Sequence, residues 1–147
     1  MGQGRAKERL IRLTAIHWIH EFINLGGVRL ISFYANILGS IMFCISDAEP
    51  DICEAAKGTN QSFIALVRTT SETFPLSPLL QLLIMDLLSE HITTRVAALQ
   101  WVNMLHEKDP QTMNTYISDL LPALLKTLSD PAEEVVLLNL QVYPMIA

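Results

Sequence analysis

Two histidines and a glutamate lie close together near the start of the chain. His17 and His20 are three residues apart and Glu21 follows directly, a spacing at which one face of a helix can chelate zinc. A protein zinc site needs three or four ligands, and the sequence offers no further ligand of suitable type and direction. We therefore interpret both histidines as ordinary residues of a polar helix face and predict no metal site.

The chain offers equally little to nucleophilic or acid–base catalysis. Cys44 and Cys53 lie among apolar residues, with no cluster of positive charge to activate either thiol. The lone His91 and His106 are expected near helix ends at the surface and need no catalytic role. The sequence contains neither a Gly-x-Ser-x-Gly elbow nor a glycine-rich loop between a strand and a helix.

Adjacent carboxylates complete the list of candidates. Glu133 and Glu134 stand near the start of a predicted helix, where negative charge favours the helix N-terminus. We read them as structural and not as an acid–base pair. The sequence thus predicts a chain that is not an enzyme, with no catalytic residue, no cofactor and no metal.

Two arginines lie within apolar helix faces and therefore need partners. Arg12 and Arg95 are 83 residues apart. Asp47 and Asp130 have the same separation, and each aspartate follows its arginine by 35 residues. Because a desolvated guanidinium is tolerated when a carboxylate pairs with it, we predict a ladder of Arg–Asp pairs between helical layers. Anion binding by the arginines is the alternative.

The interval of 83 residues relates longer stretches of the chain as well. Residues 12–19 and 95–102 both read Arg, aliphatic, any residue, Ala, aliphatic, any residue, Trp, aliphatic, and the aliphatic positions of 37–47 recur in 120–130. Half of this interval, about 41 residues, is the length of a HEAT-type helix pair. The sequence therefore predicts an all-α, HEAT-type α-solenoid of about seven helices in antiparallel A/B pairs.

Periodicity and helix breakers place the helices. We expect them at 7–25, 32–46, 50–68, 78–89, 93–106, 113–128 and 131–147. Gly26-Gly27 should end the first, Gly58 weakens the third, 69–75 should be a flexible loop, and Pro122 should kink or restart the sixth.

We group these helices as one array over residues 5–147. Its parts are pairs at 5–46, 50–89 and 92–129 and an unpaired helix at 131–147. Because that last helix is still apolar at Ala147, we expect the array to continue. Trp18 and Trp101 hold equivalent positions in the repeat, so both are expected in the middle of the core. The first helix should bury a stripe formed by Ile11, Ala15, Trp18, Ile19, Phe22 and Leu25.

Composition limits the classes of partner. Of the 147 residues, 50% are apolar and 17% charged, enough for the core of one ordinary domain. The net charge of −5 argues against nucleic acid as a ligand, since phosphate binding needs clustered Lys and Arg. The longest uncharged run, residues 30–46, is shorter than the roughly 20 apolar residues of a membrane span. Two cysteines without a secretory signal indicate a cytoplasmic chain with reduced thiols.

Several short motifs follow one another along the chain in an order that can be compared with a known protein family. They are Arg-Leu-Thr-Ala-Ile-x-Trp-Ile-x-Glu-Phe at 12–22, Asn-Gln-Ser-Phe at 60–63, Arg-Val-Ala-Ala-Leu-x-Trp at 95–101, Leu-Leu-Lys-Thr-Leu-Ser-Asp at 124–130, and Glu134-Val135. This order resembles the central region of the vacuole-morphology HEAT-repeat scaffolds, from about Leu10 to the end of the chain. The sequence departs from the family in the short 69–75 connection, where many members carry a longer polar insertion. It departs from the general HEAT pattern at Val136, where Lys or Arg is usual.

The resemblance implies a noncatalytic regulatory subunit in phosphoinositide metabolism. Such a scaffold holds a FYVE-domain phosphatidylinositol 3-phosphate 5-kinase together with a Sac-type lipid phosphatase and so controls phosphatidylinositol 3,5-bisphosphate. It implies a peripheral location on endosomal or vacuolar membranes, indirect membrane contact, and a homo-oligomer of the full-length scaffold. A HEAT-repeat adaptor of another kind, such as a transport receptor or a phosphatase regulatory subunit, shares the same generic physics and is the alternative. No family contact is assigned to a particular residue.

Overall fold

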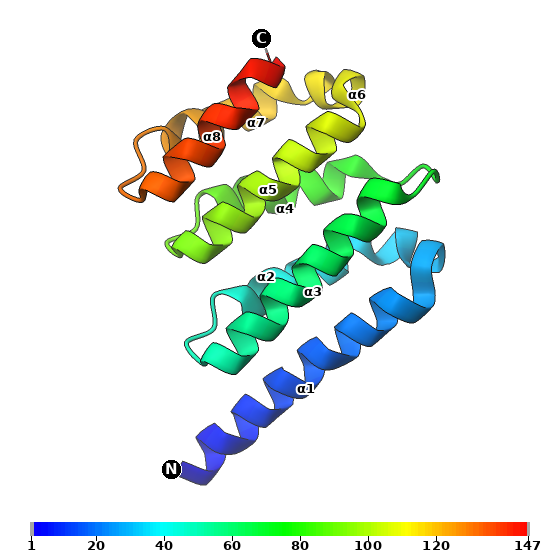
Figure 1. The fold of residues 1–147 in the computed structure, drawn as a ribbon, viewed down its shortest axis with the longest axis vertical. Coiled ribbons are helices and arrows are strands. Elements are labelled where there is room, and N and C mark those ends of the chain that lie inside the picture. Colours follow the sequence, from blue (N-terminus) through cyan, green and yellow to red (C-terminus); the bar gives the residue numbers. More distant parts are fainter. Residues whose placement is uncertain (1, 147) are drawn as a thin grey trace. The chain divides into compact units, whose positions relative to one another are not determined.

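The computed structural model describes residues 2–146, and the side chains of residues 7–27 and 29–141. Helices account for almost all of this part of the chain, and it contains no strand. In chain order they are α1 (Gly2–Gly26), the 3-10 helix η1 (Gly27–Phe33), α2 (Tyr34–Ile45), α3 (Pro50–Thr69), α4 (Leu76–Leu87), α5 (Ile92–Lys108), α6 (Pro110–Thr115), α7 (Ile117–Thr127) and α8 (Glu133–Ile146) (Figure 1). The predicted all-α class is confirmed.

The helices form two compact units, one over residues 1–75 and one over residues 76–147. The boundary lies at the end of the segment 70–75, where the expected break between helices is confirmed. It falls inside the predicted pair 50–89, so the grouping of residues 5–147 into one array remains a proposal. No helix of the described residues combines the length and the apolar character needed to cross a membrane.

In unit 1, α1 and α3 pack side by side, while η1 and α2 turn back along them (Figure 1). Gly27 makes the turn possible because its φ of +52° lies in the left-handed region, which costs glycine little. The core is closed by Tyr34 of α2, whose ring meets that of Phe63 of α3 edge to face with centroids 5.3 Å apart. The predicted end of the first helix at Gly26-Gly27 is thus confirmed.

The stripe predicted for α1 is wrong in its direction. Among the described side chains of α1, those of Ile16 and Ile23 are buried, whereas Trp18 is 58% exposed and Phe22 53%. The sequence places apolar residues all round much of this helix, and the periodicity selected the face that unit 1 leaves uncovered. The expectation that Trp18 lies in the core is therefore incorrect.

In unit 2, α5 lies between α4 and α8, and α4 also contacts α7. Covered on both flanks, α5 buries most of its residues, and Trp101 is 0% exposed. The expectation that Trp101 lies in the core is confirmed. The two tryptophans that the repeat pairs thus have unlike surroundings because the helix that covers one side of α5 has no counterpart against α1 within unit 1.

Two predicted irregularities turn out differently. α3 runs through Gly58 without interruption, since its neighbours Ala56, Thr59 and Asn60 are buried in unit 1. The predicted sixth helix is divided, but the break lies at Tyr116, six residues before Pro122. α6 starts as a separate helix because the Asp109 carboxylate caps it by accepting a hydrogen bond from the Thr112 N–H at 3.2 Å.

Candidate interaction surface

The first repeated arginine pairs with its predicted aspartate. Nε of Arg12, on α1, lies 2.6 Å from Oδ2 of Asp47, in the turn between α2 and α3, and Nη2 lies 3.3 Å from Oδ1. The Asp47 Oδ1 also accepts a hydrogen bond from the Glu49 N–H at 2.9 Å. The carboxylate therefore fixes the turn to α1 and at the same time shapes the turn itself.

The second repeated arginine repeats this geometry in unit 2. Nε of Arg95, on α5, lies 2.6 Å from Oδ2 of Asp130, and Nη2 lies 3.0 Å from Oδ1. The Asp130 Oδ1 accepts from the Ala132 N–H at 2.8 Å, as Asp47 does from Glu49. In addition, Nη1 of Arg95 donates to the Ser89 carbonyl at 2.9 Å. Both predicted pairs are thus confirmed, each within its own unit.

The two pairs differ in solvent exposure and in their electrostatic surroundings. The Arg95 and Asp130 side chains are 11% and 6% exposed, whereas that of Arg12 is 31% exposed. Burial alone would raise the pKa of Asp47, but the hydrogen bonds from Arg12 and from the Glu49 N–H outweigh it and hold that pKa below 3.8. Both guanidinium groups are engaged by carboxylates, which favours a structural role over anion binding.

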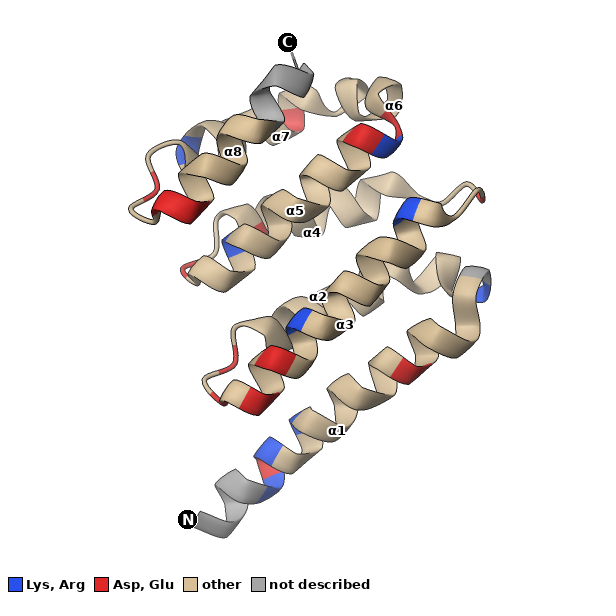
Figure 2. Cartoon of the chain, in the orientation of Figure 1, with Lys and Arg blue, Asp and Glu red and all other residues tan. Residues whose placement is uncertain are grey.

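Unit 1 extends its pair into a small charged cluster. Arg9 forms ion pairs with Asp51 and, at 3.4 Å, with Glu49. In Figure 2 the basic part of α1 lies beside the acidic start of α3 and the turn that precedes it. Position 92, which corresponds to Arg9 in the repeat, is Ile92. The Arg12–Asp47 ion pair therefore has a counterpart in unit 2, whereas the ion pairs of Arg9 do not.

The residues considered for a metal site are not brought together. His17 and Glu21 are exposed, while the His20 Nδ1 lies 3.2 Å from the Thr59 hydroxyl of α3. Within the described residues no group of three His, Cys, Asp or Glu side chains could hold a metal ion. The prediction of a polar helix face is correct for His17, but His20 is half-buried against α3. The predicted surface location of His106 is also wrong, because α5 is covered on both sides and His106 is buried.

The thiols and the adjacent carboxylates have structural surroundings. Cys44 is buried and Cys53 half-buried, both without a disulfide. Burial raises the pKa of the Cys44 thiol, which keeps it protonated and weakly reactive. The Cys53 thiol donates to the Ile45 carbonyl at 3.2 Å. Glu133 and Glu134 lie in the first turn of α8, in agreement with their structural interpretation.

Two polar residues with buried side-chain atoms were not singled out by the sequence. Asn139 of α8 is fully buried and its Nδ2 donates to the Leu124 carbonyl and the Thr127 hydroxyl of α7, at 2.7 and 2.5 Å. Asp86 of α4 has a buried oxygen, Oδ2, without a hydrogen-bond partner, and burial raises its pKa to about 6. Both are polar residues inside apolar helices, and this contrast is the sequence signal that could have identified them.

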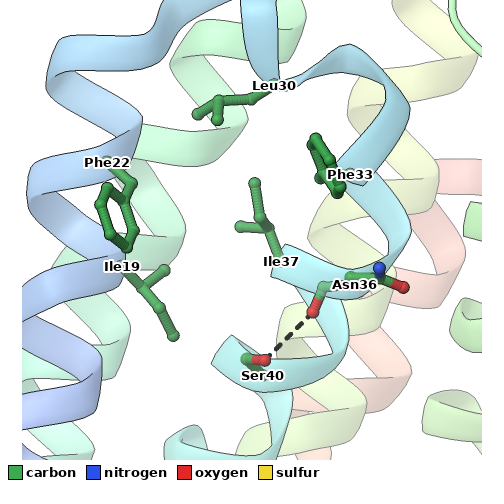
Figure 3. Close-up of a pocket in the computed structure, with 7 residues that line it drawn as sticks. All are labelled: Ile19, Phe22, Leu30, Phe33, Asn36, Ile37 and Ser40. Atoms are coloured by element: carbon green, nitrogen blue, oxygen red, sulfur yellow. Dashed lines mark hydrogen bonds between the residues drawn. The ribbon is translucent and has the colours of Figure 1, made fainter.

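The largest departure from the expected core is an apolar hollow on unit 1 (Figure 3). Its walls come from three consecutive elements, α1, η1 and α2, and the lining side chains are Ile19, Phe22, Leu30, Phe33, Asn36, Ile37 and Ser40. The Trp18 ring continues this surface along α1, with its centroid 5.8 Å from that of Phe22. An exposed apolar area of this kind indicates an interaction surface.

Comparison with known proteins identifies the relatives of the chain. The sequence is 39% identical over 140 residues to the protein VAC14 homolog of Arabidopsis thaliana, which covers 95% of this chain and 19% of the relative. The chain is a homologue of a segment of the VAC14 proteins. The vacuole morphology and inheritance protein 14 of Saccharomyces cerevisiae is 25% identical over 130 residues, 85% of this chain and 15% of the relative.

These matches confirm the resemblance to the vacuole-morphology proteins. The chain spans less than a fifth of the length of either VAC14 relative. No protein-family model and no solved structure matches the sequence. The name of the yeast relative connects that protein with the form and inheritance of the vacuole.

Proposed function

We propose that this chain is a noncatalytic segment of a HEAT-type scaffold that organises a lipid kinase and a lipid phosphatase. The kinase is a FYVE-domain phosphatidylinositol 3-phosphate 5-kinase and the phosphatase is of the Sac type. Through both enzymes the scaffold controls phosphatidylinositol 3,5-bisphosphate. The observation that carries the proposal is the 39% identity to a VAC14 protein over 95% of the chain.

The two units support a scaffold made of repeated layers. Each uses an arginine of its first repeated helix to hold the turn between the next two repeated helices, Arg12 with Asp47 and Arg95 with Asp130. Such pairs fix the geometry of a layer and leave its outer faces to partners. We therefore retain the assignment of residues 5–147 to one HEAT-type array.

The proposal includes a location and an assembly. The scaffold acts in the cytoplasm, on the surface of endosomal or vacuolar membranes, which it reaches through its partners. The full-length protein forms a homo-oligomer. The yeast relative, named for vacuole morphology, supports the vacuolar part of this proposal.

Co-purification tests the proposal. A full-length VAC14 relative is prepared with this chain in place of its matched segment, and is used to recover the kinase and the phosphatase from cells. We expect both enzymes, in the amounts recovered with the unaltered relative. As a control, the matched segment is replaced by a flexible linker of equal length, which should recover neither.

Recovery of neither enzyme with the correctly folded chimera would contradict the proposal and favour a HEAT-repeat adaptor of another kind. The noncatalytic part is tested separately. The purified chain should neither phosphorylate phosphatidylinositol 3-phosphate nor release phosphate from phosphatidylinositol 3,5-bisphosphate. Turnover that a mock purification from cells without the chain also shows would indicate a contaminating enzyme; turnover by the chain above that background would refute the noncatalytic assignment.

A further inference from the structure

The hollow on unit 1 has a volume of about 260 Å³ and is open to solvent. Ile19 and Phe22 of α1 form one wall, and Leu30 and Phe33 of η1 form the other, with Ile37 of α2 between them (Figure 3). None of the seven lining residues is charged. The hollow therefore fits an apolar occupant that needs no ionic contact.

The repeat identifies the equivalent surface in unit 2. For four of the seven lining positions, adding 83 residues leads to side chains that are at most 2% exposed: Val102, Leu105, Met113 and Leu120 correspond to Ile19, Phe22, Leu30 and Ile37. Of the other three counterparts, Ala123 is buried, Tyr116 is half-buried and Asp119 is exposed. Phe22, by contrast, is 53% exposed. The same apolar surface is thus present in both units, but it is covered in unit 2 and open in unit 1.

In unit 2 this surface is covered by α4. A space of about 380 Å³ that remains there between α4 and the start of α7 is lined by Ser77, Leu80, Gln81 and Ile84 on the α4 side. On the other side it is lined by Tyr116, Asp119 and Leu120, which lie 83 residues after Phe33, Asn36 and Ile37 of the hollow. α4 therefore covers the surface of unit 2 that corresponds to the hollow. It also contacts α5, the counterpart of α1.

We propose that the hollow and the exposed apolar side of α1 together form the docking site of an amphipathic helix that resembles α4. The helix is supplied in cis, by sequence that precedes α1 in full-length VAC14 proteins. The proposal concerns the fold of the array and does not rest on the kinase or the phosphatase.

The chemistry of α4 specifies the occupant. Its buried side chains are Leu79, Leu80, Leu83 and Leu87, at helical positions i, i+1, i+4 and i+8. Gln81 and Asp119 both line the space in unit 2, and the counterpart of Asp119 in the hollow is the uncharged Asn36. The occupant should thus carry leucine or isoleucine at this spacing and an uncharged polar residue at the rim.

Two observations favour a source in the same polypeptide. α4 is joined to α5 by only four residues, Leu88–His91. The helix that occupies this docking site in unit 2 is therefore a close neighbour of α5 in the sequence. The relatives, of which the chain spans 19% and 15%, have ample further length to supply such a helix.

A fusion tests the proposal directly. Residues 1–8 are replaced by a second copy of residues 71–91, which places a copy of α4 before Arg9 as α4 stands before Ile92. The control carries Leu80→Asp and Leu83→Asp in the added copy only. Trp18 and Trp101 are labelled with 5-fluorotryptophan, and Trp18→Phe, a change at an exposed position, assigns the two fluorine resonances without altering the core. The solvent-isotope shift between H₂O and D₂O reports how exposed each ring is.

We expect the isotope shift of Trp18 to fall at least two-fold in the fusion and to stay unchanged in the control, while that of buried Trp101 stays small throughout. An unchanged solvent-isotope shift of Trp18 in the fusion would refute the proposed docking site. In the original chain, a Trp18 shift that falls as protein concentration rises would show that a second copy fills the hollow, which would refute the source in cis. Neither result depends on the recovery of the enzymes.

Discussion

At the scale of residues, the Arg95–Asp130 pair is the more deeply buried of the two repeated contacts. Arg95 joins α5 to the turn before α8, and its partner is 6% exposed. Arg95→Met leaves the Asp130 carboxylate without its counter-ion, and loss of one member of a buried pair costs about 3–5 kcal/mol. We expect urea-induced unfolding of this variant to show a loss of about 3 kcal/mol in the free energy of unfolding.

A double variant separates the effect of the unpaired Asp130 carboxylate from the effect of the packing lost with the Arg95 side chain. Arg95→Met combined with Asp130→Leu removes the unpaired charge, so part of the stability should return. Arg12→Met, at a side chain that is 31% exposed, should lower stability less than Arg95→Met does. Equal stability of Arg95→Met and the wild-type chain would show that the pair has no structural role.

Asp86 is expected to weaken the fold at neutral pH. Burial raises its pKa to about 6, from 3.8 in the unfolded chain. Between these values the folded state binds more protons than the unfolded state, so stability falls as pH rises through this window. Asp86→Asn should raise the free energy of unfolding at pH 7.5 by about 1–2 kcal/mol, less than the full conversion of the shift because the residue is partly exposed.

The pH dependence provides the check on Asp86. For Asp47 the pH dependence of stability has the opposite sign, because its pKa is lower in the folded state. Its contribution to stability is therefore lost as pH falls below about 4. Wild-type stability should therefore decrease from pH 4 to pH 6, and Asp86→Asn should remove most of that decrease while keeping the acid limb. The same slope in both proteins would mean that Asp86 does not titrate in this range.

At the scale of elements, the two tryptophans distinguish a covered helix from an open one. Trp101 is 0% exposed between the neighbours of α5, so Trp101→Ala should cost about 3–5 kcal/mol. Trp18 is 58% exposed on α1, and Trp18→Ala should cost less than about 1 kcal/mol. Thermal unfolding of both variants measures the difference. Similar losses would indicate that α1 is covered in solution.

The sequence predicted the elements that depend on local chemistry. Helix periodicity and the Gly26-Gly27 breaker predict α1 and its end, and the constant spacing of 35 residues predicts both Arg–Asp pairs. These features could be predicted because capping, glycine conformation and the pairing of a buried charge are determined by few residues.

Other features depend on which surface meets which, and these could not be predicted. α1 is apolar on more than one side, so periodicity alone could not decide that Ile16 and Ile23 face the core while Trp18 does not. The break lies at Tyr116, where no proline or glycine marks it in the sequence, whereas Pro122 lies inside α7 and gave a misleading signal. The exposed hollow was missed because the repeat implied that equivalent residues have equivalent neighbours.

At the scale of the whole molecule, the chain combines two units that use one plan. Each has a repeated helix that carries the arginine, α1 or α5, a turn with a repeated aspartate and an apolar surface for a covering helix. The chain covers 19% of one VAC14 relative and 15% of the other, and both proteins are several times longer. A plan that repeats in this way suits extension by further layers.

The central claim is that this chain can take the place of its counterpart in a VAC14 protein. The most direct measurement replaces the matched segment of the yeast relative by this chain, in cells that lack the natural protein, and scores vacuole morphology by microscopy. We predict that the chimera restores normal vacuoles and that its Arg95→Met variant does so less well. A chimera that accumulates to the normal level, yet leaves the vacuoles as they are without the relative, would contradict the claim.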